Sequence, residues 1–336
     1  YMAVRIKDIA KLANCSEATV SLALNGSTLV NENTRKTILE TAKKAGYIPN
    51  VYAKKLARRE SRCLGLIIPD IENVFYASLV KHINAATKAS GYNLITAISE
   101  NSAETEKELI SSMIENRAEG VILVPMNKAN PDPSYVSLLD GYGIPYVFCA
   151  DYYESLHGSS AAVMSDIEKG MYELTKEVVR MGYKNPAYLT GDNSVVSLRL
   201  REKGFTRAAL ELKADSCICK LETLDYSAAY DAVRKILAEC PETDVFICVN
   251  DMIAAGVLNS LSEFGRSVPQ TGVAGFDNVI FSRISHPQIT TVEQNIREIA
   301  EKSVELLINK DEDKEDIIIP TKIIIRQSLT LKGEAK

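Results

Sequence analysis

The chain has 336 residues, more than one hydrophobic core usually organises, so two or three domains are expected. With 46% hydrophobic and 25% charged residues, no apolar run long enough to cross a bilayer and no secretory signal, it is expected to be a soluble cytoplasmic protein without a membrane partner. The net charge is −5, yet residues 1–60 hold eleven Lys or Arg and only five acids, so a basic head that attracts polyanions precedes an acidic body.

Two short helices separated by a tight turn are predicted at the start of the chain. Apolar residues recur at i, i+3, i+4 and i+7 from Ile6, which predicts a helix that ends near Ala13. Asn14 tolerates the left-handed backbone of a tight turn, and Ser16 can cap the next helix. A second apolar stripe follows and stops at Asn25-Gly26, where a helix is expected to end.

A third helix is predicted over residues 32–45. Asn31 is its expected cap, basic residues occupy its last turn, and Gly46 follows its end. Two short helices around a three-residue turn, braced by a third helix, are typical of a helix-turn-helix DNA-binding domain. From charge alone, basic helices that are simply solvated surface stay an open alternative.

A short segment, residues 50–56, follows Pro49 and begins with Asn50, a residue that can cap a helix. A helix of this length is unstable in isolation, because peptides below about 12 residues are marginal. From the residues alone, the segment is predicted to be a solvated linker when no DNA is bound.

The body of the chain, from Cys63 onward, alternates nearly continuous apolar runs with helical patterns. Such runs are expected of strands buried on both faces, and the alternation predicts an α/β fold with parallel sheets. The predicted strands are 64–68, 94–98, 121–124, 146–149, 187–189, 245–249 and 273–274, and the predicted helices include 166–181, 226–238 and 252–264.

Polar residues follow the ends of several predicted strands, namely Asp70, Asp151, Asn250, Asp251 and Asp277. Ligands of parallel sheets bind beyond the carboxyl ends of the strands. The set therefore predicts a cleft that hydrogen-bonds a polar, hydroxyl-rich molecule. For any one of these residues the alternative is a helix cap, a role that suits Asp and Asn.

The seven cysteines are scattered and are interpreted as reduced, packed thiols. Cys217 and Cys219 lie on a predicted strand, where we expect them to face opposite sides, and they have neither zinc-ligand nor redox spacing. No metal and no cofactor is predicted.

Enzymatic activity is not expected either. The sequence has no nucleophile elbow, no phosphate-binding or dinucleotide loop and no paired metal-ligand motif. Its three histidines lie far apart along the chain. The body alone would suit a sugar-binding transport receptor, but the basic head and the missing signal favour an intracellular role.

Several runs resemble the LacI/GalR (lac repressor) family of transcription regulators, nearly residue for residue in the head and in their general pattern in the body. In the head these are 6–13, 16–21, 23–26, 34–35 and 46–50, and in the body 73–77, 197–205, 249–251, 275–278 and 290–294. The resemblance implies a DNA-binding repressor controlled by a small polar, sugar-like effector. A protein coregulator in place of the small effector is the alternative.

The resemblance also implies a domain plan. The helix-turn-helix headpiece would span 2–49, a hinge 50–60, and a sensor similar to periplasmic binding proteins 61–336. The sensor would consist of two parallel-sheet α/β subdomains. The first would comprise about 61–162 and 292–325, and the second about 163–290 with the C-terminal end.

For DNA, the resemblance implies that residues 17, 18 and 22 turn toward base edges. Leu22 stands where the family commonly has Arg, so an apolar contact would replace bidentate reading of guanine. In the family, the hinge folds on the operator and a leucine at the position of Leu56 wedges into the minor groove. A homodimer is expected, because one recognition helix reads few base pairs. The implied DNA-binding residues are Lys7, Ser16, Glu17, Ala18, Thr19, Ser21, Leu22, Asn25, Thr34, Asn50, Ala53, Lys54 and Leu56.

For the effector, the resemblance implies that Phe75 and Tyr76 pack on the ligand while Arg201 and Asp277 hold its polar groups. The alternative for Arg201 is an ordinary cation on a helix surface. Val74 and Tyr152 depart from the family, which often has Pro and Arg at these positions. The implied effector-binding residues are Asp70, Phe75, Tyr76, Asp151, Arg201, Asn250, Asp277 and Gln294.

Overall fold

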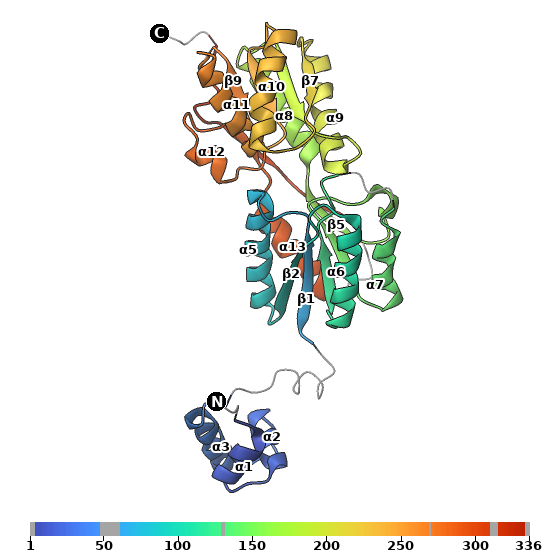
Figure 1. The fold of residues 1–336 in the computed structure, drawn as a ribbon, viewed down its shortest axis with the longest axis vertical. Helices are drawn as coiled ribbons and strands as arrows, with labels where there is room; N and C mark the ends of the chain where they lie inside the picture. Colours follow the sequence, from blue (N-terminus) through green and yellow to red (C-terminus); the bar gives the residue numbers. More distant parts are fainter. Residues whose placement is uncertain (1–3, 48–60, 129–131, 269, 310–314, 333–336) are drawn as a thin grey trace. The chain divides into compact units, whose positions relative to one another are not determined.

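The computed structural model describes residues 4–47, 61–128, 132–268, 270–309 and 315–332. The chain divides into two compact units, Tyr1–Ser61 and Arg62–Lys336 (Figure 1). Within the described ranges, every helix is too short or too polar to span a bilayer.

The first unit is a three-helix domain built from α1 (Ile6–Leu12), α2 (Glu17–Leu24) and α3 (Glu32–Lys44). Its core is small and takes one fully buried β-branched residue from each helix, namely Ile9, Val20 and Ile38. The predicted helices and their order are confirmed.

The turn between α1 and α2 has the predicted chemistry. Asn14 adopts a positive φ of 51°, and the Ser16 hydroxyl accepts the backbone N–H of Thr19 at 3.1 Å as the cap of α2. Before α3, the Asn31 side chain accepts the N–H of Asn33 at 2.9 Å. Arg35 fixes the loop between α2 and α3, because its Nη2 donates to the Ser27 carbonyl at 2.6 Å.

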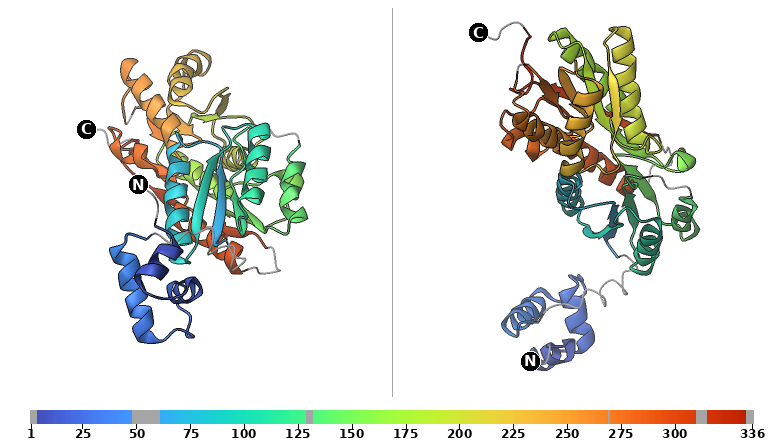
Figure 2. Two further views of the ribbon diagram at one scale, coloured as in Figure 1. Left: turned by 60° about the horizontal axis from the view of Figure 1, so that its bottom comes forward. Right: turned by 45° about the horizontal axis from the view of Figure 1, so that its top comes forward.

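The second unit contains two lobes, each with a parallel sheet between helices. The first sheet has the order β11-β5-β4-β3-β1-β2, and all its paired strands are parallel. Its strands are β1 (Cys63–Ile68), β2 (Asn93–Ile98), β3 (Gly120–Leu123), β4 (Tyr146–Cys149), β5 (Ala162–Ser165) and β11 (Ile317–Ile319). Figure 2 shows these strands enclosed by helices on both sides.

Helices cover both faces of the first sheet because successive strand residues point to opposite faces. Leu64, Leu66 and Ile68 pack against α5 (Val74–Ala89) and α13 (Ile296–Asn309). Ile67 packs on the other face, toward α6 (Ala103–Glu115) and α7 (Leu138–Gly141).

The second sheet has the order β7-β6-β8-β9 and is also parallel. One face is covered by α8 (Ile167–Arg180) and α9 (Val196–Glu211), the other by α10 (Tyr226–Glu239) and α11 (Asp251–Glu263). The short helix α12 (Ile280–Ile284) follows β9. The strands are β6 (Pro186–Thr190), β7 (Cys217–Lys220), β8 (Val245–Cys248) and β9 (Gly272–Ala274).

The chain passes between the lobes three times. The first passage follows β5, the second runs through β10 (Thr291–Glu293), and the third runs through β12 (Lys322–Ile324). The two latter strands pair antiparallel, so they tie two of the passages together. The predicted architecture, a helix-turn-helix unit and a sensor with two parallel-sheet lobes, is confirmed.

Three details differ from the sequence expectations. β2 is an edge strand whose residues are exposed or half-buried, so it is only partly covered where full burial on both faces was expected. β5 belongs to the first sheet, which therefore extends to Ser165 rather than ending near 162. Cys217 and Cys219 lie on the same face of β7, because residues two apart in a strand point the same way.

Candidate functional site

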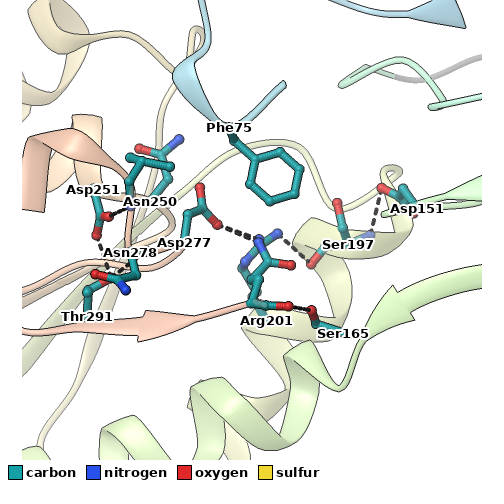
Figure 3. A network of polar contacts seen from close by, with 12 residues as sticks. Phe75, Asp151, Ser165, Ser197, Arg201, Asn250, Asp251, Asp277, Asn278 and Thr291 are labelled. Atoms are coloured by element: carbon teal, nitrogen blue, oxygen red, sulfur yellow. Dashed lines mark hydrogen bonds and ion pairs between the residues drawn. The ribbon is translucent and has the colours of Figure 1, made fainter. Parts of the chain in front are cut away.

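A cavity lies where the carboxyl ends of strands from the two lobes converge. It is lined by residues that follow β1, β3 and β4 in the first lobe, and by residues that follow β6, β8 and β9 in the second. The predicted residues in its wall are Phe75, Tyr76, Asp151, Arg201, Asn250, Asp277 and Gln294. Figure 3 shows the polar network formed by several of them.

Asp70 was also expected at the ligand but does not line the cavity. Its carboxylate accepts the backbone N–H of Glu72 at 2.7 Å, in the loop after β1. Its position after a strand is therefore explained by the turn it stabilises. Tyr152, a departure from the family pattern, also points elsewhere and stacks on His157 with the ring centroids 4.6 Å apart.

Three polar residues of the wall were missed as ligand contacts. Asn73 is the cap of α5 and accepts the N–H of Phe75 at 3.0 Å. Asn127, in the loop after β3, accepts the Tyr76 hydroxyl proton at 2.6 Å. Ser197 lies in the first turn of α9. Extending the strand-end rule a few residues past β3 would have found Asn127.

The centre of the second lobe's wall is a buried ion pair between Arg201 and Asp277. The Nη2 of Arg201 lies 3.3 Å from Oδ1 of Asp277, and the two residues are only 7% and 6% exposed. The guanidinium also lies over the Phe276 ring, 4.6 Å from its centroid. Arg201 is therefore not an ordinary cation on a helix surface.

Asp277 is held in an unusual backbone conformation. Its φ is +99°, a region that residues with a side chain rarely adopt and that costs about 1–3 kcal/mol. The N–H of Asp277 donates to the Val292 carbonyl at 2.8 Å, and the Gln294 amide donates to its Oδ1 at 2.5 Å. Burial raises the pKa of Asp277 to about 6, against the opposing effect of Arg201. Strain of this kind is characteristic of ligand sites.

Asp251, which does not line the cavity, stabilises the loop after β9 that contains Asp277. Its carboxylate accepts the N–H of Val279 at 2.8 Å and the hydroxyl of Thr291 at 2.5 Å. Gly275 is required beside it, because a side chain there would collide with the carboxylate. Burial raises the pKa of Asp251 well above its usual range, and the nearby Asp277 adds to that effect.

Asp151 connects the two lobes. It follows β4 of the first lobe, and its Oδ2 accepts the N–H of Ser197 at 3.2 Å in the first turn of α9 of the second lobe. Its Oδ1 accepts the N–H of Tyr152 at 2.8 Å. The N-cap of α9, Val195, supplies no side-chain hydrogen bond, so the carboxylate of Asp151 takes that place. Burial raises the pKa of Asp151.

An aromatic wall faces these charges. Phe75 and Tyr76 begin α5, with their rings edge to face and their centroids 5.4 Å apart. In Figure 3 the Phe75 ring points toward Arg201 and Asp277. An apolar ring opposite polar groups can hold a molecule that has an apolar face and hydroxyl edges. Among the described residues, no cluster of His, Cys, Asp and Glu could hold a metal ion.

The first unit presents a second set of predicted residues at its surface. Those that are exposed are Lys7, Ser16, Glu17, Ala18, Leu22 and Asn25, and those that are half-buried are Thr19, Ser21 and Thr34. Leu22 is 41% exposed, and Leu29, which the sequence analysis did not single out, is 84% exposed. The predicted hinge residues Asn50, Ala53, Lys54 and Leu56 lie outside the described residues.

Comparison with known proteins gives matches along nearly the whole chain. Residues 5–50 match the family described as bacterial regulatory proteins, lacI family. Residues 61–327 match the family described as periplasmic binding proteins and sugar binding domain of LacI family.

Individual proteins match over the same length. Catabolite control protein A of Priestia megaterium is 31% identical over 97% of this chain and 99% of that protein. The probable repressor ExuR of Bacillus subtilis is 30% identical over 97% of this chain and 98% of that protein. The lac repressor dimer bound to operator and the anti-inducer ONPF matches with a TM-score of 0.87 at 21% identity, over 97% and 99% of the two chains. That last similarity establishes a shared fold.

Proposed function

Because the chain belongs to the lacI family of bacterial regulatory proteins, we propose that it is a transcriptional repressor that binds operator DNA and releases or holds it according to a small sugar-like effector. One observation carries the proposal: a single chain joins a basic helix-turn-helix unit with exposed polar residues to a cleft lined by buried polar side chains. The basic unit suits binding of a polyanion such as DNA, and the cleft suits binding of a small molecule.

In this proposal α2 is the recognition helix. Glu17, Ala18 and Leu22 are exposed on it, so they are free to meet base edges in the major groove. Glu17 can accept from a cytosine amino group, whereas Leu22 offers only apolar contact, as with a thymine methyl. Lys7 and Thr34 would contact the phosphates that position the unit.

The protein would act as a homodimer on a roughly palindromic operator. One recognition helix reads few base pairs, and two-fold symmetry doubles the contact. The lac repressor, which shares the fold, is known as an operator-bound dimer. The family resemblance also implies DNA contacts at residues 50–56, with Leu56 as the minor-groove wedge, although this segment lies outside the described residues.

The effector would bind between the lobes. The first lobe supplies Phe75, Tyr76 and Asp151, and the second supplies Arg201 and Asp277. A ligand that contacts both lobes favours one arrangement of them over another by its differential affinity. Allosteric coupling of about 1–3 kcal/mol would change operator affinity about 5- to 150-fold.

The proposal is tested with the purified full-length chain in two steps. Selection from random DNA should yield a palindromic half-site that the chain binds in preference to scrambled DNA. Thermal-shift screening against sugars should then raise the unfolding temperature, since a ligand at a hundred times its Kd stabilises by about 2.7 kcal/mol. Failure to enrich any DNA sequence would contradict the proposed regulator, and a response only to a protein partner would replace the small effector with a coregulator.

A further inference from the structure

A carboxylate is buried in the first lobe, outside the cavity wall. Glu106 lies in the first turn of α6 and is 0% exposed. Within the described part of the chain it forms no ion pair, and burial raises its pKa while two tyrosine hydroxyls oppose that rise. A buried acid is costly unless it is hydrogen-bonded. Ser102 already caps α6, so the hydrogen bonds that Glu106 accepts must explain its position.

Two tyrosines from different segments donate to this carboxylate. The Tyr135 hydroxyl, in the short helical turn η1 (Ser134–Ser137), donates to Oε1 of Glu106 at 2.7 Å. The Tyr153 hydroxyl, in the loop after β4, donates to Oε1 at 2.8 Å and to Oε2 at 3.0 Å. The Tyr153 oxygen also accepts the N–H of Met126, in the loop after β3, at 3.3 Å. One carboxylate thus joins α6 to two loops that follow neighbouring strands.

The loop after β3 contributes to the cavity wall directly beyond this network. Asn127 follows Met126 and accepts the Tyr76 hydroxyl in the wall at 2.6 Å. Its own N–H donates to the side chain of Asn101 at 2.8 Å. Because a planar peptide group links Met126 to Asn127, a displacement of the first residue moves the second.

The loop after β4 contributes Asp151, two residues before Tyr153. Asp151 lines the cavity and accepts the N–H of Ser197, in the second lobe, at 3.2 Å. The Tyr153 ring is 7% exposed and packs edge to face on Phe148, with 6.1 Å between the ring centroids. Hydrogen-bonded networks in a low-dielectric interior rigidify the segments that they join. Asp151, and with it a contact between the lobes, thus lies two residues from the group that Glu106 holds.

We propose that Glu106 is a positioning residue for the cleft, although it does not line the cavity. Acting through the Tyr153 hydroxyl, it holds the loops after β3 and β4 so that Asn127 and Asp151 lie in the wall. An apolar residue in place of Glu106 removes the acceptor of two hydroxyls, whereas glutamine keeps an oxygen that can accept them. The inference rests on the proposed function only in naming the cleft as the effector site.

The test is hydrogen–deuterium exchange of the full chain at pH 7.5, read at single amides by fragmentation in the mass spectrometer. In Glu106→Leu we expect the amides of Met126 and Ser197 to exchange about tenfold faster or more, because local opening governs the exchange of a hydrogen-bonded amide. Ser197 lies in the other lobe, so its exchange reports the position of Asp151 rather than the packing around Glu106. Glu106→Gln should keep both exchange rates within a factor of about three of the wild type, since its amide oxygen still accepts.

Val304→Ala is the matched control for lost stability. It truncates a buried side chain of α13, on the opposite face of the first sheet, and should leave the exchange of both amides unchanged. Should Glu106→Leu not fold, Tyr153→Phe removes a single hydroxyl, and the exchange of its Ser197 amide decides by the same criterion. Exchange of Ser197 at the wild-type rate in the variant, or equal acceleration in Val304→Ala, overturns the inference.

Calorimetric titration with the neutral sugars D-glucose, D-galactose and D-ribose connects the inference to the proposed function. A sugar that binds the wild type should bind Glu106→Leu about tenfold more weakly and Glu106→Gln nearly as tightly, because a binding site depends on the residues that support its wall. Equal affinity of the wild type and Glu106→Leu overturns the inference and leaves the proposed function intact. Binding by none of the three sugars counts against the sugar-like effector alone, because the exchange measurement involves no ligand.

Discussion

The two units present their functional side chains in opposite ways. In the helix-turn-helix unit those residues proposed to meet DNA that the structure describes are exposed or half-buried, as Leu22 is at 41%. In the sensor the proposed ligand residues are buried, with Gln294 only 2% exposed. DNA is an extended polyanion that attracts a protein by charge over many contacts, whereas a small polar molecule needs polar atoms fixed in advance. The contrast indicates two recognition modes within one chain.

The largest expected effect concerns salt. DNA binding by the basic unit should weaken steeply, by about a thousandfold or more between 50 and 200 mM salt if six or more phosphates are neutralised. The affinity of the sensor for a neutral sugar should hardly change over the same range, because such a ligand carries no charge that salt could screen. Fluorescence anisotropy for DNA and calorimetry for the sugar measure both. A sugar affinity that falls with salt as steeply as the DNA affinity would contradict the proposed difference between the two recognition modes.

The next effect is the loss of the buried cation. Arg201→Ala leaves Asp277 buried without its ion-pair partner, and truncation of such a pair typically costs about 2–5 kcal/mol in binding. We expect ligand binding to be lost while operator affinity without ligand stays within a factor of about two. Arg207→Ala, at an exposed Arg of the same helix, is the control. Normal ligand binding by Arg201→Ala would refute the assignment of the cleft.

A smaller effect is expected at the exposed surface of α2. Leu22→Arg should introduce a preference for guanine at one position of each half-site, worth about 1–3 kcal/mol, because Arg reads guanine bidentately and Leu does not. Ligand binding in the sensor should not change. Selection from random DNA with both proteins measures the preference, and identical half-sites for the two would show that position 22 does not read bases.

The smallest effect follows from the pKa of Asp277. Burial raises this pKa to about 6, so the carboxylate is ionised at neutral pH and becomes protonated as the pH falls through 6. Since the ionised form accepts the ligand's hydroxyls, affinity should fall about tenfold between pH 7 and pH 5. Calorimetry of the neutral sugar across this range tests the sign, and tighter binding at pH 5 would contradict it.

The helix-turn-helix unit was predictable from sequence because its determinants are local. The caps of α2 and α3 lie at most three residues from the N–H groups they accept, and the left-handed Asn14 lies inside the turn it makes. Such contacts leave a pattern within a short window of sequence.

For the sensor, the sequence predicted most of the residues that line the cavity but not how these residues contact one another. Polar residues after strands pointed to Asp151, Asn250 and Asp277, while Phe75 and Arg201 came from family resemblance. The rule also selected Asp70, because a strand end does not specify which way the following loop turns. The Arg201–Asp277 pair joins residues 76 apart, and no local pattern reports such a contact.

The strands that went unpredicted are all short, although some strands of equal length, such as β3 and β9, were predicted from their apolar runs. β5 has four residues, and β10, β11 and β12 have three each. Runs of this length hold too few residues for periodicity to distinguish a strand from a loop. Their pairing partners come from distant parts of the chain, as with β11 and β5, so tertiary context rather than local sequence determines them.

We propose that a ligand in the buried cleft controls the affinity of the DNA-binding surface for its operator. The most direct test titrates the full chain onto its selected operator, with and without a saturating concentration of the neutral sugar that binds the cleft. We expect operator affinity to change about 5- to 150-fold when the ligand binds, and we expect no such change in Arg201→Ala. An operator affinity that is the same with the cleft empty and filled would contradict the claim.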